Sequence, residues 1–154
     1  MTKRTKIVLL LVIACILLIG VRWVNSRSRP IHTVGLTNGR LAECPDCINC
    51  VSTQAADPEH QLDPIPYTKS AEEAQRQLKA IIRSMPRSRI VTSNTGYVHA
   101  EFSSPLFGFV DDLEVAIDET EQLIHFRSAS RTGRSDFGVN RKRIEQIRQQ
   151  FQNR

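Results

Sequence analysis

The hydrophobic positions along this chain follow three patterns, and each pattern predicts a different kind of element. The first is an unbroken apolar run over residues 7–21, which contains no polar side chain. As a helix this run would measure about 22 Å, and extension through Trp23 and Val24 brings it close to the roughly 30 Å of a membrane core. We therefore predict that residues 1–25 form a membrane anchor or uncleaved signal, which contacts the membrane through residues 7–24.

Two other fates of this run stay open. A cleaved signal peptide normally ends in small residues, and the sequence VRWVN at 21–25 offers none. A lipoprotein would be acylated at Cys15, yet the residues that follow Cys15 are apolar. Basic residues flank both ends of the run, so charge alone does not fix its orientation. An uncleaved anchor fits best, and we expect a single-pass protein of the inner membrane with a periplasmic C-terminal domain.

The second pattern has the period of a helix. Ser70 and Glu73 have the spacing of a capping box, and apolar residues then recur on one stripe as far as Met85, where the following proline disfavours helical geometry. The same period returns near the C-terminus. There we predict a helix that begins at Asn140, as its N-cap, and ends at Phe151.

The third pattern alternates apolar and polar residues between these two helices. It predicts four strands, near residues 88–93, 97–103, 108–117 and 122–131. The turns between them are short, which favours an antiparallel meander. We therefore predict an α+β fold in which a four-stranded antiparallel sheet packs with two helices over residues 70–154. An irregular Pro-rich segment with a cysteine loop would precede it at residues 26–69.

The alternation also divides the charged side chains between the two faces of the sheet. Pairing Leu113 with Phe126 keeps the apolar residues of the last hairpin together, and pairing Phe102 with Phe109 does the same in the preceding hairpin. We then expect a solvated outer face with two polar rows, His99–Asp112–Arg127 and Tyr97–Glu114–His125. The alternative is a polar site, because a His between carboxylates can titrate near neutral pH. Asp111 falls on the core side, where a carboxylate needs a partner, and the candidates are Arg127, Arg131, Arg134 and Arg143.

Charge excludes one class of partner. The net charge is +5, but four of the 21 basic residues flank the apolar run and the others nearly balance the 16 acidic ones. The folded part therefore lacks the basic excess of a nucleic-acid binder. Basic residues do crowd the start of the last helix at 141–143, where the helix dipole disfavours cations. Asp111 or Asp136 could compensate them, and the alternative is a bound anion.

Three stretches together resemble a known family. They are Gly39-Arg40-Leu41 leading into CPDCINCVST, GFVDDLE at 108–114, and RSASRTGRSDFGVNRKRIEQIR at 127–148. The chain is similar to the uncharacterised family catalogued as domain of unknown function 1499. This resemblance implies an exported, lumenal or membrane-tethered protein, and it brings no settled activity. Its pattern carries over to Cys44, Asn49, Cys50, Asp111, Asp112, Arg127, Ser128, Ser130, Arg131, Asp136, Gly138, Asn140 and Arg143.

The cysteine loop CPDCINC allows two interpretations. Its spacing of three suits zinc or iron–sulfur ligands, so a metal bound by Cys44, Cys47 and Cys50 is one alternative, although a fourth ligand is missing. The family pattern includes Cys44 and Cys50 but departs at Cys47. Together with export, the resemblance implies a disulfide between Cys44 and Cys50 and an odd thiol at Cys47.

No catalytic group stands out. His99-Ala-Glu101 lacks the rest of a deaminase signature, and a hydrolase built on Ser128 or Ser130 with a His would lack the usual nucleophile elbow. We expect a non-catalytic domain without a cofactor, which binds a protein partner or a small anionic ligand. The candidate residues are Asp111, Asp112, Arg127, Ser128, Ser130, Arg131, Asp136, Asn140 and Arg143. The alternative is a redox or metal-handling protein that uses the cysteine loop.

Overall fold

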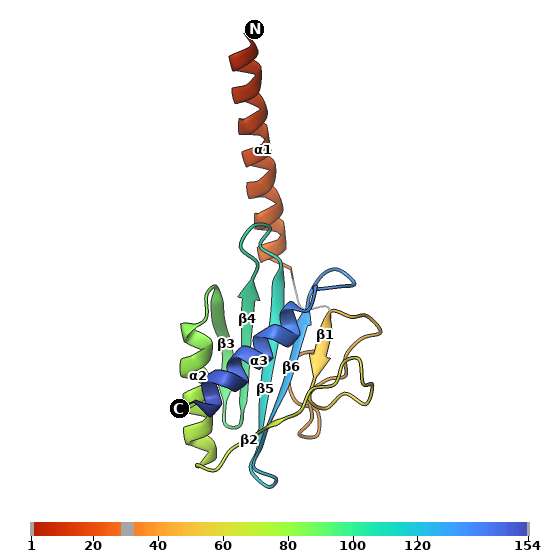
Figure 1. Cartoon of the computed structure of the whole chain (residues 1–154), viewed down its shortest axis with the longest axis vertical. Coiled ribbons are helices and arrows are strands. Elements are labelled where there is room, and N and C mark those ends of the chain that lie inside the picture. Colours follow the sequence, from red (N-terminus) through yellow and green to blue (C-terminus); the bar gives the residue numbers. More distant parts are fainter. Residues whose placement is uncertain (1, 29–32, 154) are drawn as a thin grey trace.

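The computed structural model describes residues 2–28 and 33–153, and within them it contains three helices and one antiparallel sheet (Figure 1). The helices are α1 (Lys3–Ser26), α2 (Ala71–Ser84) and α3 (Val139–Gln152). The strands are β1 (Cys50–Ser52), β2 (Ile65–Pro66), β3 (Ser88–Asn94), β4 (Tyr97–Ser103), β5 (Val110–Asp118) and β6 (Leu123–Ser130). The predicted α+β class and the antiparallel sheet are confirmed.

The sheet has six strands, so the predicted number of four is wrong. Its order is β1-β6-β5-β4-β3, and β2 also pairs with β6. Both additional strands come from the segment 26–69, which was expected to be irregular. Cys50 of β1 lies opposite Ala129, and Ile65 of β2 lies opposite Ile124, so the two short strands share one edge of β6. Three and two residues are too few to display the period of a strand, which is why the sequence did not indicate them.

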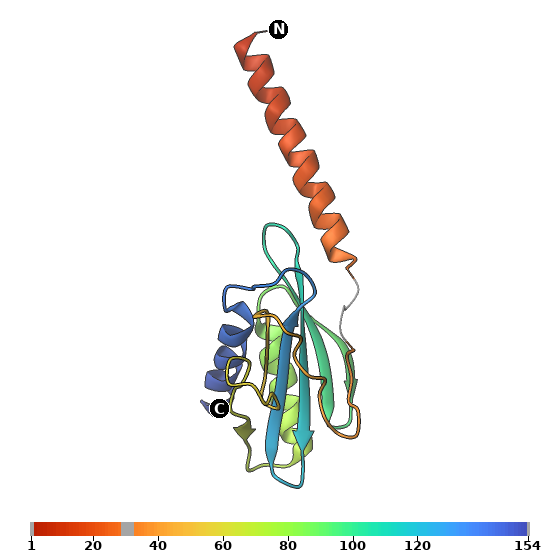
Figure 2. The same cartoon turned by 90° about the vertical axis from the view of Figure 1, so that its right-hand side faces the viewer.

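Helices α2 and α3 cover the same face of the sheet, and the apolar core lies between them and the strands (Figure 2). The capping box of Ser70 and Glu73 is present, and α2 ends where Met85 adopts extended backbone. Helix α3 begins at Val139, and its N-cap lies two residues earlier than predicted. Gly138, in left-handed conformation, is its N-cap rather than Asn140. Asp136 accepts the backbone N–H of Asn140 at 2.7 Å, which leaves the Asn140 side chain to point into the core.

The residues on each face are as predicted, but both hairpins are shifted by two residues. Leu113 lies opposite Ser128 instead of Phe126, and Phe102 lies opposite Asp111 instead of Phe109. A shift of two keeps every side chain on its face and changes only its cross-strand partner.

The outer face is buried, so the expectation of a solvated face is also wrong. Residues 33–47, called here the cover segment, cross this face on the side away from the helices (Figure 2). The Gly35 amide donates to Glu114, and Leu41 packs against Tyr97 and Ala116. This segment has neither helical nor strand periodicity, so its position could not be inferred from the sequence.

Helix α1 projects from one end of the domain, and none of its residues is buried (Figure 1). By length and composition it could cross a membrane, and a signal sequence near the N-terminus would have the same properties. Its last turns contact the loop at 104–109 that joins β4 to β5, through Arg22 and Asn25.

Candidate functional site

Consecutive carboxylates on β5 place two separate polar networks on the two faces of the sheet. Asp111 points to the helix face and Asp112 to the outer face, as expected for neighbours on a strand. The nine candidate residues therefore do not form one site. Asp111, Ser128, Ser130, Asn140 and Arg143 meet on the helix face. Asp112, Arg127 and Arg131 lie on the other face, and Asp136 caps α3.

On the helix face, Arg143 is the centre of a closed network. Its Nη2 donates to Asp111 Oδ2 at 2.6 Å, and its Nη1 donates to Ser128 Oγ at 2.9 Å and to Asn140 Oδ1. Ser130 donates to the second oxygen of Asp111 at 2.6 Å. The partner that the core-side Asp111 requires is therefore Arg143.

An open cleft of about 340 Å³ lies beside this network. It is bounded by the end of α2, the start of α3 and the β4–β5 loop. Its lining residues are Met85, Pro86, Arg87, Phe102, Ser103, Ser104, Pro105, Asp111, Val139, Lys142, Arg143 and Gln146. The Arg143 guanidinium also lies 4.4 Å from the centre of the Phe102 ring, so the cleft wall is both apolar and cationic.

Two further cations at the cleft are not neutralised by a described acidic side chain. Arg87 and Lys142 are both exposed, and neither has an ion-pair partner within the described residues. Arg87 uses only its Nε, which donates to the Ser103 carbonyl at 3.0 Å. The only acidic residue of the lining is Asp111, which already pairs with Arg143. The cleft therefore has an excess of positive charge, and the first turn of α3, which lacks acidic side chains, adds to it.

On the outer face, Asp112 is held by Arg131 and His99. It accepts hydrogen bonds from Arg131 at 2.7 and 2.8 Å and from His99 Nε2 at 2.8 Å. Arg131 also contacts Glu101 at 2.5 Å. Burial tends to raise the pKa of Asp112, but the hydrogen bonds from Arg131 and His99 outweigh burial and keep that pKa below its ordinary value. The pKa of Glu101 is lowered in the same way, against burial, by Arg89 and Arg131.

A second acid–arginine pair on this face, Glu114–Arg127, is completely buried. Arg127 Nη1 donates to Glu114 Oε2 at 3.0 Å, and both side chains are fully buried. Tyr97 donates to the other Glu114 oxygen at 2.8 Å, and the Gly35 amide donates to the same atom at 2.6 Å. Burial and the neighbouring Glu114 raise the pKa of Tyr97, so its hydroxyl stays protonated as the donor. No hydrogen-bond partner for Arg127 Nε or Nη2 is found within the described part of the chain.

The predicted rows are therefore correct in some contacts and wrong in others. The neighbours His99–Asp112 and Tyr97–Glu114 do interact, but diagonally rather than directly across the strands. Arg127 pairs with Glu114 instead of Asp112. His125 contacts Thr53 at 3.1 Å instead of Glu114.

The serines do not form a hydrolase arrangement with a His. Ser128 bonds to Asn140 and Arg143, and Ser130 bonds to Asp111 and Asn140. His99 lies on the opposite face of the sheet, so it cannot reach either hydroxyl.

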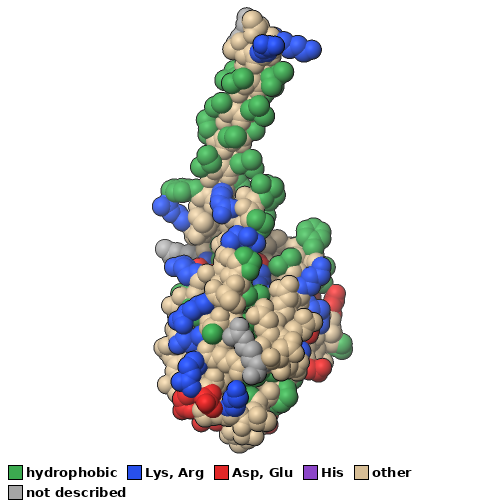
Figure 3. All heavy atoms as spheres, turned by 60° about the vertical axis from the view of Figure 1, so that its left-hand side comes forward, with side chains coloured by type: hydrophobic (Ala, Val, Ile, Leu, Met, Phe, Trp, Pro, Cys, Tyr) green, Lys and Arg blue, Asp and Glu red, His purple; other side chains and the backbone are tan. Residues whose placement is uncertain are grey.

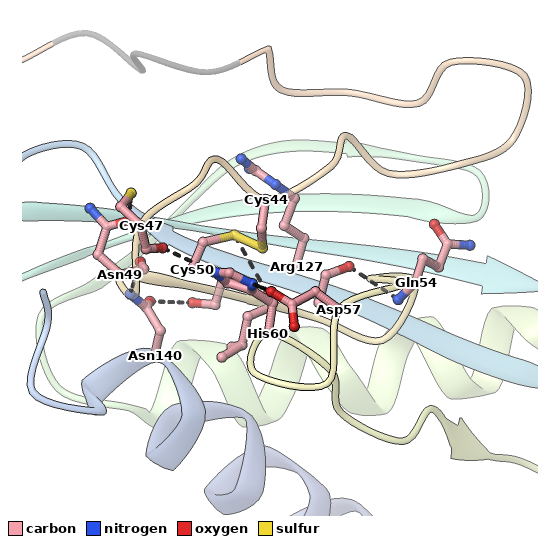
Figure 4. The surroundings of a disulfide bond; sticks show 12 residues. Cys44, Cys47, Asn49, Cys50, Gln54, Asp57, His60, Arg127 and Asn140 are labelled. Carbon is pink, nitrogen blue, oxygen red and sulfur yellow. Dashed lines mark hydrogen bonds and ion pairs between the residues drawn. A yellow bond between two sulfur atoms is a disulfide. The ribbon is translucent and has the colours of Figure 1, made fainter. Parts of the chain in front are cut away.

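The disulfide between Cys44 and Cys50 is confirmed. Two of the three cysteines of the metal alternative are thus bonded to each other. Cys47 is half-buried, and Figure 4 shows its side chain beside Asn49, to whose Oδ1 the thiol donates at 2.9 Å. His60 lies close by, with Nδ1 at 2.9 Å from Asp57 and Nε2 at 3.1 Å from the Cys47 carbonyl oxygen, not from its sulfur.

Sequence reasoning missed other groupings. Lys142 belongs to the basic run at the start of the last helix, but nothing in the sequence connects it with Arg87, which follows α2. Asp118, Glu121 and His125 have potential metal-ligand atoms within 4.8 Å of one another, at the β5–β6 turn. Asp118 and His125 are half-buried and Glu121 is exposed.

Comparison with known proteins gives one result. Residues 40–151 match the family described as "Protein of unknown function (DUF1499)", and the chain belongs to this family. A search of curated proteins finds no match. The match includes the disulfide, both acid–arginine networks and the cleft, whereas α1 lies outside it.

Proposed function

We propose that this protein is a membrane-tethered, extracytoplasmic domain of the inner membrane, and that it binds a small anionic ligand with an apolar part without transforming it. The ligand would occupy the cleft between α2, α3 and the β4–β5 loop. Its anionic group would meet Arg87 and Lys142, and its apolar part would contact Phe102, Met85 and their neighbours.

The observation that carries this proposal is the unequal pairing of charges in the cleft. Arg143 is neutralised by Asp111 and held by three hydrogen bonds, so it forms a fixed part of the cleft wall. Arg87 and Lys142 line the same cleft, and neither has an ion-pair partner among the described residues. Cations without acidic neighbours at the start of a helix favour a bound anion.

Two features support the tether and its compartment. Helix α1 is apolar over a length that suits a bilayer and buries no residue against the domain. The Cys44–Cys50 disulfide fits an oxidising compartment, such as the periplasm.

A tethered protein stays in the membrane pellet after alkaline carbonate extraction and keeps its N-terminal residues. Release of a shortened chain would instead identify residues 3–26 as a cleaved signal.

Binding can be tested with the full chain in nanodiscs of phosphatidylcholine. The probes are hexyl phosphate, inorganic phosphate and hexanol, measured by isothermal titration calorimetry. Hexyl phosphate should bind at least about tenfold more tightly than either simpler probe, because only it meets both the cations and the apolar wall. Raising the salt concentration should weaken its binding.

The control for this experiment is a charge-matched double variant. Arg87→Gln/Lys142→Gln should lower the affinity for hexyl phosphate about tenfold. Lys69→Gln/Arg76→Gln removes the same charge near the opposite end of α2 and should leave the affinity unchanged. Equal affinities in both double variants would show that the cleft is not the binding site.

A further inference from the structure

The end of the domain nearest α1 exposes large apolar side chains. Within the β4–β5 loop, Leu106 is 58% exposed, Phe107 41% and Phe109 42%. The β6–α3 loop lies at the same end (Figure 1) and exposes Phe137 by 90%. Clustered exposed apolar residues on loop tips, in a protein whose core is otherwise well buried, indicate an interaction surface.

The β4–β5 loop is fixed directly to the end of α1. Arg22 Nη1 donates to the Pro105 carbonyl at 2.6 Å, and Asn25 Nδ2 donates to the Phe107 carbonyl at 2.9 Å. Gly108 permits this close approach, because a Cβ at that position would lie 2.9 Å from the Arg22 side chain. The tip of the loop therefore lies beside the last turns of α1.

Those turns have the chemistry of a membrane interface. Trp23 is exposed, and the Arg27 guanidinium lies 3.7 Å from the centre of its ring. Tryptophan and arginine of this kind gather where hydrocarbon gives way to headgroups. Figure 3 shows apolar side chains around most of α1 and basic ones where it meets the domain.

The length of the apolar run strengthens this placement. Residues 7–21 measure about 22 Å as a helix, which is shorter than a hydrocarbon core of about 30 Å. A short apolar span draws its flanking residues toward the bilayer. Since Arg22 and Asn25 carry the β4–β5 loop with them, the loop is drawn to the same depth.

We propose that Leu106 and Phe107 insert into the interfacial layer of the bilayer that α1 crosses, so that the domain docks on the membrane surface in a fixed orientation. The partner is the lipid interface itself. The inference rests on the proposed tether but not on the proposed ligand. Phe137, at the same end, would provide a second point of contact.

The experiment places a tryptophan at the loop tip of the full chain in liposomes. The chain has one natural tryptophan, so Trp23→Phe gives a silent background for Phe107→Trp. A matched control is Thr120→Trp, at the exposed β5–β6 turn on the far end of the domain (Figure 1). Emission is quenched either by lipids brominated near the headgroup or by iodide in the water.

We expect brominated lipids to quench the probe at position 107 at least about threefold more than the probe at position 120, with the opposite order for iodide. Equal iodide quenching at both positions would place the loop in water and overturn the proposal. Protection of position 107 from both quenchers would mean that a protein surface covers the loop, which also overturns it. The unmodified protein tests the tether separately, since Trp23 should be quenched by brominated lipids whether or not the loop inserts.

Discussion

Asp111 and Asp112 are adjacent in the chain, and each is paired with an arginine, yet their surroundings differ. The Asp111–Arg143 pair lies at the wall of an open cleft on the helix face. The Asp112–Arg131 pair lies on the outer face, where Arg131 also donates to the Ser28 carbonyl. Pairs of the same chemistry thus have different roles on the two faces.

The outer-face network fixes the cover segment to the sheet, whereas the helix-face network forms part of the cleft wall. Glu114 receives the Gly35 amide, so it fixes the cover segment to β5 while it also pairs with Arg127. Arg143 instead lines the cleft, beside Arg87 and Lys142, which have no ion-pair partner within the described residues. Mutations should therefore affect mainly stability on the outer face and mainly binding at the cleft.

The largest expected effect on stability comes from breaking the buried Glu114–Arg127 pair. Glu114→Leu leaves Arg127 buried without its carboxylate and also releases the cover segment. Removing one member of a buried pair typically costs about 3–5 kcal/mol, and we expect a loss of that size in the free energy of unfolding, measured with urea. The double variant Glu114→Leu/Arg127→Met should recover much of it, because no unpaired charge remains. A loss below about 1 kcal/mol in the single variant would mean that water reaches Arg127.

A smaller effect is expected from removing the disulfide that fixes the end of the cover segment. Cys44→Ser/Cys50→Ser opens a very short loop, which the chain-entropy relation values at about 2 kcal/mol. Urea unfolding measures this loss, and Cys47→Ser should change stability much less. Thiol counting gives an independent check, with two free thiols expected in the unmodified protein. If Cys47 were found in mixed disulfides with Cys44 or Cys50, the redox alternative would gain support.

The elements that the sequence predicted well are those with a clear period. The limits of β4 were predicted correctly, and those of α2, β3, β5 and β6 to within about two residues. The predicted register of the two hairpins was wrong. The alternation of apolar and polar residues shows which face of the sheet a residue occupies, but not which residue lies opposite it on the next strand. The charged residues of the outer face predict a solvated surface. Only the position of the cover segment, which has no periodicity, shows that they are buried.

The candidate site could be predicted only in part. Asp111 was expected to need an arginine, and Arg143 was among the candidates, because a buried carboxylate must be compensated. The cleft itself could not be predicted. Arg87 follows α2 and Lys142 lies in α3, more than fifty residues later, and only the packing of both helices on one sheet face brings them to the same opening.

Acid should affect the outer face in a direction set by its lowered pKa values. The pKa values of Asp112 and Glu101 lie below those of the unfolded chain, near 4, so these groups stabilise the fold above that pH. Their contribution is lost as the pH falls through the lower, folded values. The free energy of unfolding should therefore decrease as the pH falls below about 4. Asp112→Asn should flatten this decrease, and an unchanged slope would place the acid sensitivity elsewhere.

The smallest effect on stability is expected at the cleft. Arg87→Gln/Lys142→Gln removes two exposed cations that have no ionic partner among the described residues, so the free energy of unfolding should change by no more than about 0.5 kcal/mol. A slight gain is reasonable, because Lys142 lies in the first turns of α3, where the helix dipole disfavours a positive charge. Urea unfolding of this variant beside Glu114→Leu compares the two faces directly. A loss above about 1 kcal/mol would show that the cleft cations stabilise the fold, and an anionic ligand would no longer be needed to explain them.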